Sequence, residues 1–153
     1  MIDERFETTS VAMERVVFMT FQAPSEDVDR IMGEVVKVTP LAMGKYDSNS
    51  YQTGAGMERY RPLEGAAAGA ETDVRKRPGI VEVSFELPDD RHVVDRVIEA
   101  IFQSHSYQEP VIRLQPLLSS RSKGLDDSAN RNRWWNTTGD WLKAGDKADS
   151  QGG

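Results

Sequence analysis

The sequence contains no cysteine. This absence excludes disulfides, thiolate metal sites and cysteine nucleophiles, and it is typical of proteins that work in a reducing compartment. No apolar run approaches the roughly 20 residues that a transmembrane helix requires, and residues 1–5 lack the apolar core of a signal peptide. We therefore expect a cytoplasmic protein that makes no membrane contact.

Positive charge is also scarce. The chain has 19 Lys and Arg residues against 25 Asp and Glu residues, which gives a net charge of −6. Nucleic acids and anionic membranes attract a positive field, so general affinity for either is not expected, although a local basic patch is compatible with the sequence. With only two histidines, a closed zinc site would need carboxylates as its main ligands. No metal ligands are predicted.

Catalytic motifs are missing as well. The sequence has no nucleophile-elbow, Walker, zincin or dinucleotide-binding motif. The acidic pairs 89–90 and 126–127 suit a helix start and a loop rather than a general acid/base pair. We predict that the protein is not an enzyme, and the sequence leaves any cofactor unknown.

The length of 153 residues is typical of one domain that buries its own core. Residues 1–14 are polar without a clear period, and we interpret them as an N-terminal extension. Residues 15–118 hold the apolar periodic segments and form the predicted domain. Residues 119–153 are a polar tail that contains tryptophans, and we expect its end, 144–153, to be disordered.

Two segments open the domain. Residues 16–21 are apolar and β-branched or aromatic, which predicts a buried strand. A helix is expected from Ser25, whose hydroxyl suits an N-cap. Its apolar stripe has a spacing of three and four residues: Val28, Ile31, Met32, Val35 and Val36. Residues 45–52 are expected to form a polar second strand. A long glycine-containing connection, 53–79, follows, in which 58–61 can pair as a short strand.

The second half repeats this order. Residues 81–87 alternate between apolar and polar side chains, which predicts a strand with one buried face. Residues 88–90 begin the second helix, and 111–114 form the last strand. The apolar stripe of this helix is the strongest in the chain: Val93, Val94, Val97, Ile98, Ile101 and Phe102.

The element order predicts an α+β fold, a ferredoxin-like βαββαβ sandwich. Right-handed crossovers give a four-stranded antiparallel sheet with both helices on one face. The other face of the sheet then needs cover. We therefore expect a homo-oligomer, with a trimer favoured.

Three segments resemble a known family. They are residues 44–56, 60–66 and 105–110, in that order. They are similar to the YqfO-like domain, which occurs alone and as an insert in the dinuclear-metal-centre proteins known as type 2 homologues of GTP cyclohydrolase. The resemblance covers roughly residues 16–118 and implies a PII/CutA-like fold and trimers.

The sequence departs from that family pattern at Ala67, Ala68, Ser106 and Gln108. In the larger relatives the dinuclear site belongs to other domains. No bound dinuclear metal centre is therefore carried over to this chain.

Two groups of residues are candidates for ligand binding. His105, Tyr107 and Glu109 follow the second helix and are able to converge on a metal ion or small ligand. The favoured alternative is a tight corner in which His105 caps helix carbonyls.

The second group lies in the glycine-rich connection, since Arg binds phosphate or carboxylate. It contains Arg59, Arg61, Gly65, Arg75, Lys76 and Arg77. The favoured alternative is a solvated loop. Arg61 also suits an intersubunit salt bridge with Glu64 or Glu109.

The tail carries the remaining candidates, Trp134, Trp135 and Trp141. Arginines among aromatic residues suit base stacking, and exposed tryptophans suit a protein partner. The favoured alternative is that they dock on this protein's own sheet or on a neighbouring subunit.

Two functions follow from these observations. The first is a non-catalytic, oligomeric PII/CutA-like binding or sensor module for a small anion or metal ion. The alternative is a protein-interaction or scaffold module that uses the open sheet face and the tail. The sequence specifies neither the ligand, the partner, the oligomer number nor the roles of the two ends.

Overall fold

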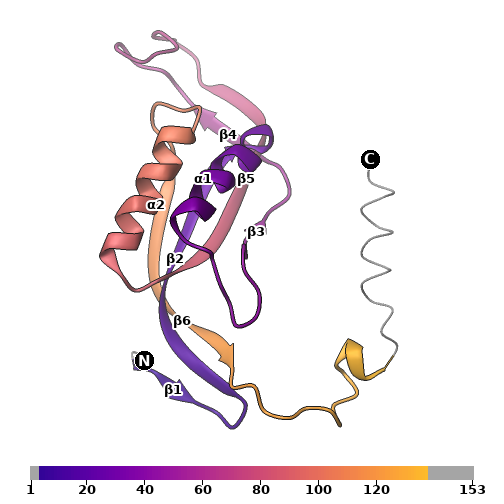
Figure 1. Ribbon diagram of the computed structural model, residues 1–153. Coiled ribbons are helices and arrows are strands. Elements are labelled where there is room, and N and C mark those ends of the chain that lie inside the picture. The colour runs from indigo at the N-terminus through magenta and orange to yellow at the C-terminus, as the bar shows by residue number, and fades with distance from the viewer. Residues whose placement is uncertain (1–3, 138–153) are drawn as a thin grey trace. The chain divides into compact units, whose positions relative to one another are not determined.

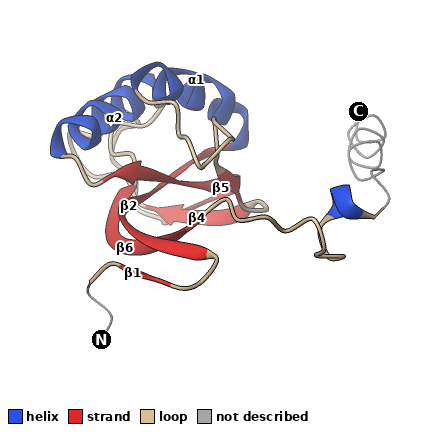
Figure 2. Cartoon of the chain, turned by 60° about the horizontal axis from the view of Figure 1, so that its bottom comes forward, coloured by secondary structure: helices blue, strands red, loops and turns tan. Residues whose placement is uncertain are grey.

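The computed structural model describes residues 4–137. Two α-helices lie on one face of an antiparallel sheet (Figures 1 and 2). The strands are β1 (Phe6–Glu7), β2 (Val11–Pro24), β3 (Tyr51–Gln52), β4 (Gly56–Tyr60), β5 (Arg75–Pro88) and β6 (Ile112–Ser122). The helices are α1 (Val28–Val38) and α2 (Arg91–Ser104), with short 3-10 turns η1 (Ser25–Asp27) and η2 (Trp134–Asn136). Neither α1 nor α2, in the described part of the chain, has the length and apolar character needed to cross a membrane.

The chain divides into two units, Met1–Ser122 and Lys123–Gly153. In the first unit β2 lies between β5 and β6, while β3 and β4 pair with the far side of β5 and β1 pairs with β2. All of these pairings are antiparallel. The predicted ferredoxin-like α+β fold is confirmed. The expected number of four strands is wrong, because β1 and β4 add to the four expected strands and bring the sheet to six.

The core lies between the helices and alternate residues of β2 and β5. The buried side chains come from both strands and both helix stripes, and the largest are Phe21, Met19, Ile31, Leu87 and Ile101. Each fully buried large side chain stabilises the fold by about 1.5–3 kcal/mol. Two members of the predicted stripes, Val36 and Phe102, are exposed instead, because each stripe is wider than the contact with the sheet.

The two helix starts differ in how well they were predicted. Asp90 is the N-cap of α2, and its carboxylate accepts a hydrogen bond from the His92 N–H at 2.9 Å. Ser25 is not the cap of α1, because η1 comes first and Asp27 occupies the N-cap position. The Asp27 side chain makes no capping bond. It contacts Ser106 and Arg30 instead.

The strands extend further than their apolar segments. β2 begins at Val11, so residues 11–14, expected in the extension, belong to the sheet. β5 begins at Arg75 and β6 ends at Ser122. Of residues 45–52 only Tyr51–Gln52 form a strand. The expected connection 53–79 is largely a β4–β5 hairpin with a loop at 61–74.

The sheet curls at one end. Arg121 of β6 pairs with Ala12, whereas Glu86 of β5 pairs with Phe18, six residues further along β2. In a flat sheet the two side chains would be about 20 Å apart along the strands. Arg121 Nη2 nevertheless lies 2.8 Å from Glu86 Oε2. The outer parts of β2 and β6 therefore bend across the face opposite the helices, as Figure 2 shows.

Candidate functional site

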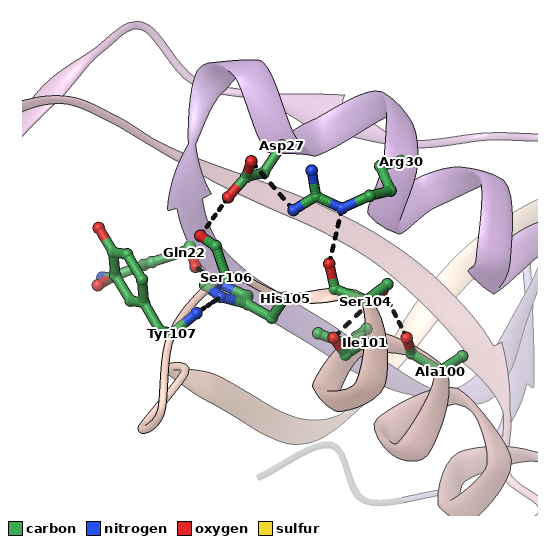
Figure 3. A network of polar contacts seen from close by, with 9 residues as sticks. All are labelled: Gln22, Asp27, Arg30, Ala100, Ile101, Ser104, His105, Ser106 and Tyr107. Atoms are coloured by element: carbon green, nitrogen blue, oxygen red, sulfur yellow. Dashed lines mark hydrogen bonds and ion pairs between the residues drawn. The ribbon is translucent and has the colours of Figure 1, made fainter. Parts of the chain in front are cut away.

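His105 sits at the C-cap of α2 and uses both of its ring nitrogens (Figure 3). Nδ1 accepts a hydrogen bond from the Tyr107 N–H at 3.0 Å. Because a backbone N–H is always the donor, the remaining proton belongs on Nε2, which lies 2.7 Å from the Gln22 carbonyl oxygen. The prediction that the His105 ring caps helix carbonyls is therefore wrong. The ring bonds to the Gln22 carbonyl of β2 instead.

Asp27 connects the start of α1 to the end of α2 (Figure 3). Its carboxylate accepts a bond from the Ser106 hydroxyl and pairs with Arg30 Nη2 at 3.0 Å. Arg30 Nε also donates to the Ser104 carbonyl at 2.9 Å. Burial acts to raise the pKa of Asp27, but the bonds from Ser106 and Arg30 and the Arg30 charge outweigh it and lower this pKa. The network fixes the corner that carries Tyr107.

Tyr107 joins this corner to the β4–β5 hairpin. Its ring lies 4.9 Å from the His105 ring, and the Arg77 guanidinium lies 5.2 Å from the Tyr107 ring centre. The Tyr107 hydroxyl donates to Glu58 Oε2 at 3.1 Å. Burial, helped by Glu58, raises the pKa of Tyr107 to about 12. The phenol is therefore held in its neutral, donating form.

The same side of the hairpin contains further contacts. Glu58 and Arg77 are direct cross-strand partners, as are Tyr60 and Arg75. Arg75 donates to Tyr60 and to Glu71 in the 61–74 loop. The Ala67 N–H of that loop donates to the Gln108 side chain at 2.9 Å. These contacts tie the loop to the corner.

The other side of the hairpin is different, and we call it the outer hairpin face. It consists of Met57, Arg59, Arg61, Leu63, Val74 and Lys76. Between 57 and 63 the odd-numbered residues are exposed while Glu58, Tyr60 and Pro62 are covered, as expected where side chains alternate. Arg59 is directly opposite Lys76. Within the part of the chain that the structure describes, Arg59, Arg61 and Lys76 have no acidic partner.

The structure thus divides the predicted ligand-binding residues. His105 and Tyr107 lie together in the corner, whereas Arg59 and Arg61 lie on the outer hairpin face. Gly65 is in the hairpin loop with φ +90°, and Glu109 is exposed beyond the corner. Lys76 and Arg77 were among the basic residues considered for anion binding, but their pairing with Arg59 and Glu58 was not predicted. Glu58 was not predicted as a site residue, and the polar pattern of this segment gives no signal of the cross-strand register.

The chemistry of the corner is structural. The Ser106 hydroxyl donates a hydrogen bond to Asp27 and not to His105, and both His105 ring nitrogens are bonded to backbone groups, so His105 does not activate Ser106. Over residues 4–137 no group of three His, Asp or Glu side chains comes together that would hold a metal ion. A groove between α1 and α2 contains none of the predicted site residues; its charged lining residues have both signs: Arg30, Glu34, Asp95, Arg96 and Glu99.

The second unit is described from residue 123 to 137. Asn136 donates to the carbonyls of Asp127 and Asn130, both at 2.8 Å, which closes a compact turn. Trp134 and Trp135 stack edge to face with ring centres 5.8 Å apart, and Trp135 is exposed. Trp141 and residues 144–153 lie outside the described residues.

No protein-family model matches the chain, and no curated protein matches its sequence. Among solved structures, a Bacillus cereus protein related to NIF3 is 16% identical with a TM-score of 0.58. The alignment covers 71% of this chain but 27% of that protein, so the chain spans less than a third of its length. CutA1 from Shewanella sp. SIB1 is 12% identical with a TM-score of 0.50, over 68% of this chain and 82% of that one. The fold is CutA-like.

Because the identities are low, the resemblance to these solved structures shows the fold alone. A PII-like protein from Thiomonas intermedia K12, bound to ADP, AMP and bicarbonate, is 10% identical with a TM-score of 0.44. The alignment covers 71% of this chain and 97% of that one. Membership of the YqfO-like family stays a prediction.

Proposed function

We propose that the protein is a non-catalytic, oligomeric PII/CutA-like module that binds a small anion through Arg59, Arg61 and Lys76. One observation carries the proposal. Arg59 and Lys76 are direct cross-strand neighbours of like charge, with Arg61 two residues further on. Like charges in this arrangement are destabilising unless an anion lies between them.

The wider chain supports a local anion site rather than a general one. The net charge of the chain is −6, so the cluster of Arg59, Arg61 and Lys76 is a local positive patch on a negatively charged protein. Arg supplies paired N–H donors that match phosphate and carboxylate oxygens. A metal ion, the other predicted ligand, is less well supported, because the described residues bring together no cluster of suitable ligands.

The non-catalytic part of the proposal rests on the corner. His105 has no ring nitrogen left to accept a proton from a nucleophile, since Nδ1 accepts from Tyr107 and Nε2 donates to Gln22. The oligomeric part rests on the sheet face opposite the helices. The curled ends of β2 and β6 cover this face only in part, so a second copy would cover the rest. We propose a trimer in the cytoplasm, and light scattering of the full chain tests its mass.

Thermal-shift and calorimetric titrations test the anion site. The panel contains phosphate, pyrophosphate, citrate, nucleotides and divalent cations. We expect at least one anion to raise the melting temperature of the wild type, and the double variant Arg59→Gln/Lys76→Gln to lose this effect. Lys45→Gln, an exposed cation in the turn between α1 and β3, is the matched control. An anion effect that survives the double variant would refute the proposed site.

A protein-interaction role of the tail is the second candidate function. The exposed Trp135, with Arg133 at 6.0 Å from its ring centre, favours it because aromatic and Arg side chains dominate binding hot spots. The variant Trp134→Ala/Trp135→Ala in the full chain tests this role. Loss of a co-purifying partner, with unchanged oligomer mass, would support it; loss of the oligomer would show that the tryptophans act between subunits.

A further inference from the structure

We infer that His105 is a pH-dependent switch, in which a proton taken up at ring Nδ1 releases Tyr107 from the β4–β5 hairpin. The switch consists of contacts within one chain. It does not use the proposed anion-binding residues Arg59, Arg61 and Lys76, so it goes beyond the proposed function and is tested separately from it. Three observations support it.

The first observation is the hydrogen bonding of the His105 ring (Figure 3). Nδ1 accepts from the Tyr107 N–H at 3.0 Å, and Nε2 lies 2.7 Å from the Gln22 carbonyl oxygen. In an imidazolium ion both ring nitrogens are donors. A proton on Nδ1 would face the Tyr107 N–H, and two donors form no hydrogen bond. The bond from Nε2 to Gln22 would persist and strengthen, because its donor becomes charged. Proton uptake therefore breaks the bond to Tyr107 and leaves the ring attached to β2.

The second observation is that Tyr107 connects this ring to the hairpin. Its hydroxyl donates to Glu58 Oε2 of β4 at 3.1 Å, and the guanidinium of Arg77 in β5 lies 5.2 Å from its ring centre. The His105 ring centre lies 4.9 Å from the same Tyr107 ring. A protonated His105 would place a second cation beside the ring that Arg77 already contacts, and like charges repel. This repulsion and the lost backbone bond both act to move Tyr107 away from the hairpin.

The third observation concerns the charged groups around the ring. The charge of Asp27 in η1 interacts with that of His105 and favours the protonated ring, while the opposing charge of Arg30 in α1 is paired with Asp27 at 3.0 Å. Histidine is the side chain that ordinarily changes its charge between about pH 5 and about pH 8. Asp27 stays ionised there, because its pKa is lowered from the ordinary 3.8. The Tyr107 phenol stays neutral, since burial and Glu58 raise its pKa to about 12. The other charged groups on the elements that meet here are Glu58, Arg77, Glu82 and Glu109.

Nuclear magnetic resonance of the histidine rings in the full chain tests the switch. The sequence contains two histidines, and the exposed His92 is an internal reference in the same sample. At about pH 8 we expect the His105 ring in its Nε2–H form, and at about pH 5 we expect it to be protonated. The Tyr107 amide signal should move with the midpoint of His105 and not with that of His92. The exchange protection of this amide, corrected for the intrinsic pH dependence of exchange, should fall by about tenfold or more.

Two variants separate the switch from a merely structural role of the ring. The side-chain amide of His105→Gln keeps an acceptor for the Tyr107 N–H and a donor for the Gln22 carbonyl, but it takes up no proton between about pH 5 and about pH 8. Its Tyr107 amide signal should therefore be insensitive to pH. Tyr107→Phe keeps the backbone bond to His105 but has no hydroxyl for Glu58. The carboxyl carbon signal of Glu58 should respond at the His105 midpoint in the wild type and not in Tyr107→Phe. Circular dichroism checks that both variants fold.

The outcomes that would overturn the inference are specific to the switch. A His105 ring that stays neutral down to about pH 5 in the folded wild type would do so, and this measurement needs no variant. A ring that takes up a proton while the Tyr107 and Glu58 signals stay in place would do so as well. A Tyr107 response that persists in His105→Gln would assign the proton to another group. The pyrophosphate titration of Arg59→Gln/Lys76→Gln decides the anion site independently of all three results.

Discussion

The corner at residues 104–107 depends on a small number of side chains that each make several bonds. His105 bridges two backbone groups that belong to different elements, the Gln22 carbonyl in β2 and the Tyr107 N–H. We expect His105→Ala to lower the free energy of unfolding by about 1–3 kcal/mol, because a partly buried donor and acceptor would lose their partner. Urea denaturation measures the change.

The other histidine provides the control. His92 is exposed in the first turn of α2, and only its backbone N–H is bonded to Asp90. His92→Ala should therefore leave the stability nearly unchanged. Equal effects of the two substitutions would contradict the role assigned to the His105 ring.

Asp27 predicts how stability depends on acid. Its pKa is lowered in the folded protein from an ordinary value of 3.8, so its carboxylate stabilises the fold above that value. This stability is lost as the pH falls below 3.8 and through the lowered pKa, where the carboxylate takes up a proton. Asp27→Asn should flatten this part of the profile. Denaturation between about pH 2 and about pH 6 measures it, and an unchanged acid slope in the variant would refute the assignment.

At the scale of elements, the hairpin and α1 contain glycines with opposite requirements. Gly79 has φ +80° in β5, next to the register shift between Gly56 and Met57. An added Cβ would meet nothing within 4 Å, so any cost of Gly79→Ala comes from the backbone alone. We expect it to destabilise by about 1–2 kcal/mol.

Gly33 in α1 is the matched substitution. It also has open space around its Cβ position, but its backbone is helical. Gly33→Ala should stabilise the protein by up to about 1 kcal/mol through helix propensity. Thermal denaturation of both variants gives the comparison, and a stabilising Gly79→Ala would show that the hairpin relaxes to a different turn.

The predictability of each element follows from where its side chains lie. The β5 segment 81–87 and the α2 stripe were predicted because burial of one face leaves an apolar period in the sequence. β4 and the ends of β2 and β6 are held by backbone pairing, and their exposed or half-buried side chains leave no such period. The candidate site could be predicted only in part, because backbone register leaves no pattern in the sequence. Cations on the outer hairpin face are visible in the sequence, but the cross-strand register that places Lys76 beside Arg59 is not.

At the scale of the whole first unit, the curl depends on the Glu86–Arg121 pair. The two side chains are 19% and 24% exposed, and Ser119 also donates to Glu86. We expect Arg121→Gln to increase amide hydrogen exchange at 11–15 and 118–122 while the helix-covered part of the sheet stays protected. Arg91→Gln, which breaks a well-exposed pair with Asp95, should leave exchange unchanged. Uniform protection in both variants would show that backbone pairing alone holds the curl.

The pairing of β2 with β6 also has a consequence for synthesis. Val11 is in register with Ser122, a separation of 122 − 11 = 111 residues. The central strand β2 therefore emerges from the ribosome well before β6, its neighbour on one side. The nascent chain carries one open edge of β2 while the intervening residues are translated, and completion of the sheet is slow because it pairs residues far apart in the sequence. Holdase chaperones would find this strand accessible until β6 is released from the exit tunnel.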